Sequence, residues 1–540
     1  MFTNIKSEKR LIFVVLLLIL GLASVLRFYK LDQVPPAIYW DEAANGYNAY
    51  TIANWGRDEW GKFLPTSFKS FGDDKNPVHI YLTVIPVRIL GLNEFSTRLP
   101  AALMGILGVL MVYLLGEAIF NNKKIGLISA LVFAVSPYTL QFSRFNHEAI
   151  FTIFFFMLGL WLFLKGVKVK PKLIPLSFFV FGVSILTYHS AKIVVPPVIL
   201  LLIVLYFKDL WKQKGLFLGG LIILGIVMSV FIFNPALLGM ARASQTSVPV
   251  ESIQKMSLYK KTGNELLGRV ELSWQRYLTY FGYDFLFVSG DKIARHSSQG
   301  AGEFYRIDLI FLVIGLLSLI RYRRKESLIL LSWAVLAPIP GSIAGGITET
   351  AHAGRSLFIM GSWHLLAGLG YYSFLKIFRK TWVIVIVGVI LLGILGWQMK
   401  DYLNYYYGEY VTRYAIEWQY GMKQISQYLQ EHDGYSQVYI TDARVEPYIF
   451  LLYYMQVPLP RFLDTVYYND TQSRPSNLVT FFDKYHFGDW DPIESFPNPG
   501  VLYVLTPSQY DGLRYKQQFK VKKLIKYPNG LDAFYLVALY

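Results

Sequence analysis

Two adjacent carboxylates, Asp41 and Glu42, follow the first long hydrophobic segment of the chain, next to Tyr39 and Trp40. A carboxylate pair at a membrane face can supply a general base, hold a metal ion or simply end a solvated loop. Which role applies depends on the side of the membrane that this segment faces and on the other residues that meet it there.

Other residues suited to acid, base or phosphate chemistry are gathered in a few short polar stretches. These stretches are 73–77, 143–148, 188–192, 291–296 and 351–355, and they contain Asp74, Lys75, Arg144, His147, Glu148, His189, Lys192, His296, His352 and Arg355. The hydrophobic runs between them carry almost no charge. Because transporters usually hold ionisable groups near the middle of the bilayer, this distribution favours an active site at one membrane surface.

The elements that must position these groups are predominantly membrane helices. The chain is 54% hydrophobic and 17% aromatic, more than a soluble domain needs for its core. We therefore expect a polytopic α-helical membrane protein with about 11 spans. The apolar runs lie at 11–28, 99–120, 125–142, 149–164, 173–188, 193–207, 215–233, 306–320, 328–345, 356–375 and 381–398. The first run ends in Arg27-Phe28-Tyr29-Lys30, which predicts a retained anchor rather than a cleaved signal peptide.

The distribution of charge predicts the orientation of these spans. When the loops are assigned alternately to the two sides, one set contains 19 of the 52 basic residues but only four of the 36 acidic ones. The positive-inside rule makes this set cytoplasmic, so the amino terminus faces in and Asp41 faces out. This alternation holds only if the segment 78–92, which contains Arg88, does not cross the membrane. We therefore predict that this segment is a helix lying in the outer membrane interface. The positive charge thus reflects topology, and nucleic acid is not an expected partner.

The composition changes after about residue 398. We predict a transmembrane module over 1–398, with outer loops 29–98 and 234–305, and an extracytoplasmic soluble α/β domain over 399–540. Within that domain the pattern predicts helices at 411–431 and 446–456 and strands at 437–441, 501–505 and 533–539. The chain has no cysteine, so no disulfide supports either part.

In order and spacing, these motifs resemble the polyprenyl-phosphate-dependent membrane glycosyltransferases of GT-C type. That superfamily includes protein O-mannosyltransferases and the lipid A aminoarabinose transferase. The resemblance covers about 1–400, and no single motif is specific by itself. It rests on Asp41-Glu42, Asp74-Lys75-Asn76-Pro77, the stretch from Arg98 to Leu103, Ser143-Arg144 with Glu148, and His352 to Arg355.

The resemblance implies transfer of a sugar from a lipid-linked polyprenyl-phosphate donor to an acceptor hydroxyl at the outer face of the cytoplasmic membrane. Such chemistry needs a base for the acceptor and positive charge for the departing phosphate. Asp41 is the predicted base of an inverting displacement, supported by Glu42, with Glu148 binding the acceptor or a metal. The predicted phosphate-binding residues are Lys75, Arg144, Lys192 and Arg355. Asp74, His296 and His352 are candidates for substrate or metal binding, so a divalent cation stays open as a cofactor.

Two other classes of function remain open at this level. A transporter or flippase of lipid-linked sugars would use breaks such as Pro196-Pro197 and Pro338-Ile339-Pro340. A non-catalytic envelope assembly protein would use the soluble domain alone and would tolerate loss of Asp41. The motifs also depart from the family pattern, because Glu148 stands where many relatives have Asp and no lectin-like repeat domain is present. The acceptor, whether envelope glycan, glycolipid or glycoprotein, is therefore not defined by the motifs.

Overall fold

The computed structural model of the protein describes residues 2–239, 247–322, 324–345, 351–444, 446–469, 479–488 and 497–540. Parts of two predicted outer loops, at 240–246 and 346–350, lie outside these residues. The chain divides into two compact units that are each discontinuous in sequence. We call Met1–Tyr29 with Ala101–Tyr406 the membrane unit, and Lys30–Pro100 with Tyr407–Tyr540 the sheet unit.

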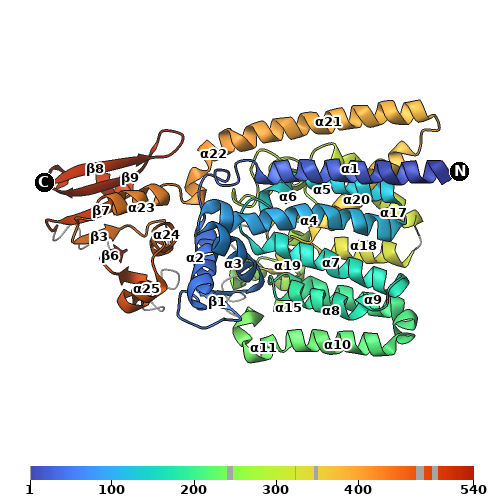
Figure 1. The fold of residues 1–540 in the computed structure, drawn as a ribbon, viewed down its shortest axis with the longest axis horizontal. Coiled ribbons are helices and arrows are strands. Elements are labelled where there is room, and N and C mark those ends of the chain that lie inside the picture. The colour runs from blue at the N-terminus through green and yellow to red at the C-terminus, as the bar shows by residue number, and fades with distance from the viewer. Residues whose placement is uncertain are drawn as a thin grey trace. The chain divides into compact units, whose positions relative to one another are not determined.

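The membrane unit consists of long apolar helices that lie side by side with their axes roughly aligned (Figure 1). Every apolar run found in the sequence coincides with helix. The helices are α1 (Phe2–Phe28), α4 (Glu94–Phe120), α5 (Lys123–Val135), α6 (Pro137–Phe142), α7 (Glu148–Lys168), α8 (Leu173–Ile185), α9 (Ala191–Trp211), α10 (Lys214–Met228), α11 (Val230–Phe233), α17 (Asp308–Arg321), α18 (Lys325–Leu336), α19 (Ile339–Ile343), α20 (Ile359–Leu375) and α21 (Thr381–Tyr407). The closest packing joins α7 to α8, α17 to α20 and α5 to α20.

Seven stretches of helix in the described residues are long and apolar enough to cross a membrane. They are Glu8–Phe28, Glu94–Phe120, Glu148–Lys168, Ala191–Trp211, Lys214–Phe233, Lys325–Ile343 and Thr381–Arg413. The apolar helices α8 and α17 are shorter than this length. The predicted polytopic helical class is thus confirmed. A proline explains why one apolar run is divided into two shorter helices, because Pro137 begins α6 directly after α5 ends.

Short helices fill the described part of the long loop 234–305. They are α13 (Val250–Gln254), α14 (Ser257–Thr262), α15 (Glu265–Thr279) and α16 (Tyr283–Phe287). Asn264 begins α15 by accepting hydrogen bonds from the Leu266 and Leu267 amides, as a helix cap does. This helix is important for the site because it carries Arg269.

The sheet unit begins with α2 (Trp40–Trp55), the hairpin β1 (Phe68–Ser70) and β2 (Asp73–Lys75), and α3 (Val78–Leu90). The helix expected at 78–92 is therefore present. Helix α2 packs against α3 and against α24 (Pro447–Tyr454). Gly46 permits the second contact, since a Cβ there would lie 2.6 Å from a ring carbon of Tyr453 and 2.8 Å from Thr97 Oγ1.

The sheet unit ends in a mixed sheet of seven strands in the order β4-β5-β6-β3-β7-β9-β8. Strand β3 is parallel to both β6 and β7, and the other pairs are antiparallel. The α/β character predicted for this region is therefore observed. The strands are β3 (Gln437–Ile440), β4 (Tyr467–Tyr468), β5 (Val479–Phe482), β6 (Tyr485–Phe487), β7 (Val501–Leu505), β8 (Phe519–Lys526) and β9 (Asp532–Leu539).

One predicted helix of this region is broken in the structure. In place of 411–431 there are α22 (Glu409–Arg413), a 3-10 turn at Ala415–Trp418, and α23 (Met422–Glu431). Gln419 and Gly421 both adopt left-handed backbone conformations, with φ of 57° and 109°, and a right-handed helix cannot continue through them. The other helices in the described part of this region are α25 (Leu459–Thr465) and α27 (Pro507–Asp511).

Candidate active site

Asp41 lies in the first turn of α2 and forms an ion pair with Lys75. The Lys75 Nζ is 2.7 Å from Asp41 Oδ1, and 36% of the Asp41 side chain remains exposed. An acid in the first turn of a helix is favoured by the amide groups that point toward it. Asp41 therefore has a positive neighbour in Lys75 and is also accessible to a second molecule. A catalytic base requires such access.

Asp74 does not join this pair, although it precedes Lys75. Both residues lie in β2, where successive side chains point to opposite faces of the strand. The Asp74 carboxylate accepts a hydrogen bond from Ser67 Oγ at 3.3 Å. Its role in substrate or metal binding stays a prediction.

Glu42 has a different environment from its neighbour Asp41. Its carboxylate is fully buried and is held by the Arg98 guanidinium, with Nε to Oε1 at 3.0 Å and Nη2 to Oε2 at 3.2 Å. Arg98 also donates to backbone carbonyls of the segment that leads into α2, at Leu31, Pro35 and Ala37. Glu42 thus fixes the start of the helix that carries Asp41.

Two further acids of the sheet unit, Glu446 and Glu59, interact with this region, and no motif in the sequence singled them out. Glu446 is fully buried, and neither of its carboxyl oxygens has a hydrogen-bond partner among the described residues. It stands at the N-cap of α24 in a left-handed conformation with φ of 55°, but its side chain does not cap the helix. Burial and the nearby carboxyls of Glu59 and Asp41 raise the pKa of Glu446 to about 9. Burial likewise raises the pKa of Glu59 to about 8.

The membrane unit contains a cavity of about 430 Å³ that is lined by several basic side chains. Lys192 and Arg355, both predicted to bind phosphate, line it together with Arg269 and His189. Lys192 Nζ lies 2.9 Å from His189 Nδ1 and also donates to the Leu237 carbonyl. Arg355 donates from Nη1 to the Gly345 carbonyl at 2.6 Å. The cavity has the positive charge that a phosphate group needs.

A second cavity, of about 540 Å³, adjoins the first and is mostly apolar. The two cavities share Arg269 and Ile343 in their walls. The rest of the second wall comes from α15, α18 and α19, and consists of Val270, Ser273, Trp274, Tyr277, Val335, Ile339 and Ser342. Sequence reasoning missed Arg269, which lies on α15 four residues after Glu265 and pairs with it at 2.5 Å. The signal in the sequence that could have identified Arg269 was its position on a helix with one apolar face.

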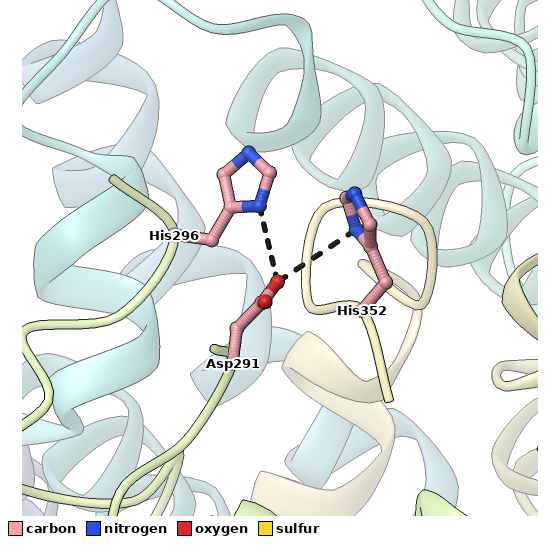
Figure 2. Close-up of side chains that lie close together, drawn as sticks. All are labelled: Asp291, His296 and His352. Carbon is pink, nitrogen blue, oxygen red and sulfur yellow. Dashed lines mark hydrogen bonds and ion pairs between the residues drawn. The ribbon is translucent and has the colours of Figure 1, made fainter. Parts of the chain in front are cut away.

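His296 and His352 come together around Asp291, as Figure 2 shows. Asp291 Oδ2 is 3.0 Å from His296 Nδ1 and 3.7 Å from His352 Nδ1. Asp291 is fully buried, and burial raises the pKa of its carboxyl. Burial and the adjacent His296 ring hold the pKa of His352 well below its usual range, so this imidazole is neutral. Asp291 was not among the predicted site residues, although it precedes His296 by only five positions.

Arg144 and Glu148 have local partners in the membrane unit. The Arg144 guanidinium is buried and donates to three carbonyls at the end of α1, those of Leu26, Arg27 and Tyr29. Such contacts join the 143–148 segment to α1, and they favour a positioning role for Arg144. Glu148 begins α7, with Oε2 at 3.6 Å from His147 Nδ1. Phosphate binding by Arg144 and acceptor binding by Glu148 stay predictions.

The chain is similar in sequence to known mannosyltransferase-type proteins over part of its length. Residues 74–233 match the family model described as dolichyl-phosphate-mannose-protein mannosyltransferase. Two proteins of Bacillus subtilis (strain 168), named "Putative mannosyltransferase YkcB" and "Putative mannosyltransferase YycA", are 31% identical over 214 residues and 28% identical over 216 residues. Each match covers 39% of this chain but only 28% and 30% of the relative's own length.

The fold is similar to solved structures over nearly the whole chain. ArnT from Cupriavidus metallidurans bound to undecaprenyl phosphate aligns with a TM-score of 0.58 at 16% identity, covering 96% of this chain and 97% of ArnT. The oligosaccharyltransferase AglB from Archaeoglobus fulgidus, in complex with an inhibitory peptide and a dolichol-phosphate, aligns with a TM-score of 0.53 at 14% identity. That match covers 98% of this chain and 74% of AglB. The protein therefore has the fold of these two membrane glycosyltransferases, and the fold that the sequence resemblance implied is confirmed.

Proposed function

We propose that this protein is an inverting glycosyltransferase that takes its sugar from a polyprenyl-phosphate donor. The pair of adjoining cavities in the membrane unit carries the proposal. One has the basic side chains of Lys192, Arg269 and Arg355, and the other is apolar. A molecule with a charged phosphate joined to a long hydrocarbon chain matches this combination, since the phosphate needs cations and the chain needs apolar walls.

Asp41 is the proposed base that removes the proton from the acceptor hydroxyl. The resulting oxygen attacks the anomeric carbon as the bond from that carbon to the phosphate oxygen breaks, so the configuration inverts. The leaving phosphate receives the negative charge, and the basic side chains stabilise it. Lys75 orients Asp41 through their ion pair at 2.7 Å, and Glu42 positions α2 through Arg98.

We further propose that this chemistry takes place at the outer face of the cytoplasmic membrane, with the amino terminus inside. The acceptor would then be an envelope glycan, a glycolipid or a protein. A role in hexose or pentose transfer is consistent with the mannosyltransferase-type relatives and with ArnT, whose structure contains undecaprenyl phosphate.

The test is sugar transfer in vitro from polyprenyl-phosphate sugars by the full chain and by Asp41→Asn. We expect the substitution to slow transfer by about 10²- to 10⁴-fold, the usual contribution of a general base. Binding of polyprenyl phosphate, measured separately, should be unchanged. Asp32→Asn is the matched control, because Asp32 is an exposed acid that precedes Asp41 in the same unit.

Two outcomes would contradict the proposal. Transfer that survives in Asp41→Asn at the wild-type rate would remove Asp41 as the base. If the wild-type chain transfers no sugar from any lipid-linked donor, but moves such lipids across vesicle membranes, it is a transporter instead.

A further inference from the structure

We propose that Asp291, His296 and His352 form a binding site for one divalent transition-metal ion of the class that Zn²⁺ represents. The site would hold the ion whether or not the proposed transfer reaction takes place, so the inference goes beyond that function. It rests on the geometry of three side chains that come from two separate segments of the membrane unit.

The three ligand atoms are already spaced almost as a metal ion would space them. The two distances to Asp291 Oδ2 are 3.0 Å from His296 Nδ1 and 3.7 Å from His352 Nδ1. One potential ligand atom from each residue lies within 4.8 Å of the other two. Metal bonds of about 2.0–2.1 Å in a tetrahedral arrangement place ligand atoms about 3.4 Å apart. The observed distances bracket this value, so binding needs only small side-chain movements.

The kinds of ligand determine which ions fit. Two imidazole nitrogens with one carboxylate oxygen suit Zn²⁺ and its neighbours in the first transition series. Mg²⁺ and Ca²⁺ prefer oxygen ligands, usually six or more. Three protein ligands also leave a coordination position for water or for an anionic oxygen.

The surroundings fix the ligands in the way that metal sites usually require. Asp291 Oδ1 accepts a hydrogen bond from the Ile293 amide at 2.9 Å, and Oδ2 accepts one from the Ala353 amide at 2.8 Å. Figure 2 shows both rings turned so that a nitrogen faces this carboxylate. Such outer contacts orient a ligand and hold its rotamer. In the ion-free arrangement, His296 and Asp291 share a hydrogen bond, and the ion would take the place of its proton.

An ion at this site would also affect the basic cavity, through the backbone between His352 and Arg355. His352 Nδ1 accepts a hydrogen bond from the Arg355 amide at 3.3 Å, and the Arg355 side chain lines the basic cavity. If the ion binds His352 at Nδ1, this hydrogen bond must break. Occupancy of the site is therefore coupled to the backbone position of Arg355.

The test uses the full chain in detergent, carrying a tag without histidine and stripped of metal by a chelator. Zn²⁺ is added, and bound ion is measured by calorimetry and by elemental analysis after dialysis. We expect one Zn²⁺ per chain, with Mg²⁺ in large excess failing to displace it. His296→Gln and His352→Gln should each weaken binding by at least about tenfold. His432→Gln is the control, because this histidine belongs to the sheet unit and stacks on Tyr428.

A second measurement needs no variant and so does not depend on how well a variant folds. Co²⁺ added to the metal-free wild-type chain should give the visible absorption of a tetrahedral nitrogen and oxygen site, and Zn²⁺ should abolish it. No binding of Zn²⁺ by the wild type, or equal binding by the His296→Gln, His352→Gln double variant, would overturn the proposal. The cluster would then be a hydrogen-bonded Asp-His group that only joins two segments.

Discussion

The two units of the molecule differ in the ionisable side chains that surround their candidate site residues. In the sheet unit, Asp41, Glu59 and Glu446 interact electrostatically, with Lys75 as the cation that acts on all three. In the membrane unit, Lys192, Arg269 and Arg355 line one cavity. In the proposed reaction, the exposed carboxylate of Asp41 would accept a proton and the basic groups would bind the phosphate. Burial of an acid has two outcomes in the sheet unit: Glu42 is neutralised by Arg98, whereas Glu446 is neutralised by its own proton.

The largest effect on stability is expected from breaking the pair of Glu42 and Arg98. Glu42→Gln leaves the Arg98 guanidinium buried without its counter-charge, which should lower the free energy of unfolding by about 3–5 kcal/mol. The measurement is thermal or urea unfolding of the purified chain, with transfer assayed on the folded fraction. Glu117→Gln is the control, because Glu117 belongs to a pair that is more than a third exposed. Normal stability with lost transfer would instead make Glu42 part of the chemistry.

The next effect concerns the basic cavity of the membrane unit. Lys192→Gln should weaken binding of polyprenyl phosphate by about 10- to 100-fold, since a charge-assisted hydrogen bond contributes roughly 1.5–3 kcal/mol. Arg269→Gln should act in the same direction. Lys212→Gln is the matched control, because Lys212 is 74% exposed and pairs with Asp209. Equal affinity in all three variants would show that the cavity does not hold the phosphate.

A smaller effect is expected from the proton carried by Glu446. Its pKa is about 9 in the folded chain, above the value of about 4.3 for an unfolded glutamate. The proton on Glu446 therefore stabilises the folded state fully at pH values below the unfolded pKa, and this stabilisation is lost as the pH rises through 9. Glu446→Gln keeps the shape but cannot ionise, and should recover roughly 1–3 kcal/mol at alkaline pH.

This prediction is checked by the unfolding midpoint between pH 6 and pH 9.5. The midpoint of the wild type should fall over this range, and that of Glu446→Gln should fall less. Glu409→Gln removes an exposed carboxyl that pairs with Arg413, and should leave the wild-type pH profile unchanged. Parallel profiles for the wild type and Glu446→Gln would mean that Glu446 does not carry a proton in the folded state.

The smallest effect on stability is expected at Lys75. Its pair with Asp41 is partly exposed, and such pairs contribute roughly 0–1 kcal/mol. Lys75→Gln should therefore leave the unfolding midpoint almost unchanged while it slows transfer. Lys75→Arg should restore part of the rate, because the positive charge returns. A rate that is equally normal in both variants would show that Asp41 needs no cation beside it.

Local patterns in the sequence were sufficient to predict the main elements. The apolar runs predicted the helices of the membrane unit, because a bilayer requires long apolar stretches whatever their partners. Short apolar runs rich in β-branched and aromatic residues likewise predicted β3, β7 and β9. The helix predicted at 411–431 was wrong as a single element, because the left-handed residues Gln419 and Gly421 interrupt it, and only the glycine is an obvious breaker in the sequence.

The sequence by itself determined the membrane class and the resemblance to GT-C glycosyltransferases, and it predicted Asp41, Lys75, Lys192, Arg355, His296 and His352 as site residues. Each of these depends on residue type and on spacing over short distances. Only the tertiary structure decided that Asp41 acts on Glu446, that Arg98 neutralises Glu42, and that Arg269 lines the same cavity as Lys192. These pairs are separated by tens to hundreds of residues. Their proximity follows from the packing of whole helices, which depends on long-range contacts such as that of Gly46 with Tyr453.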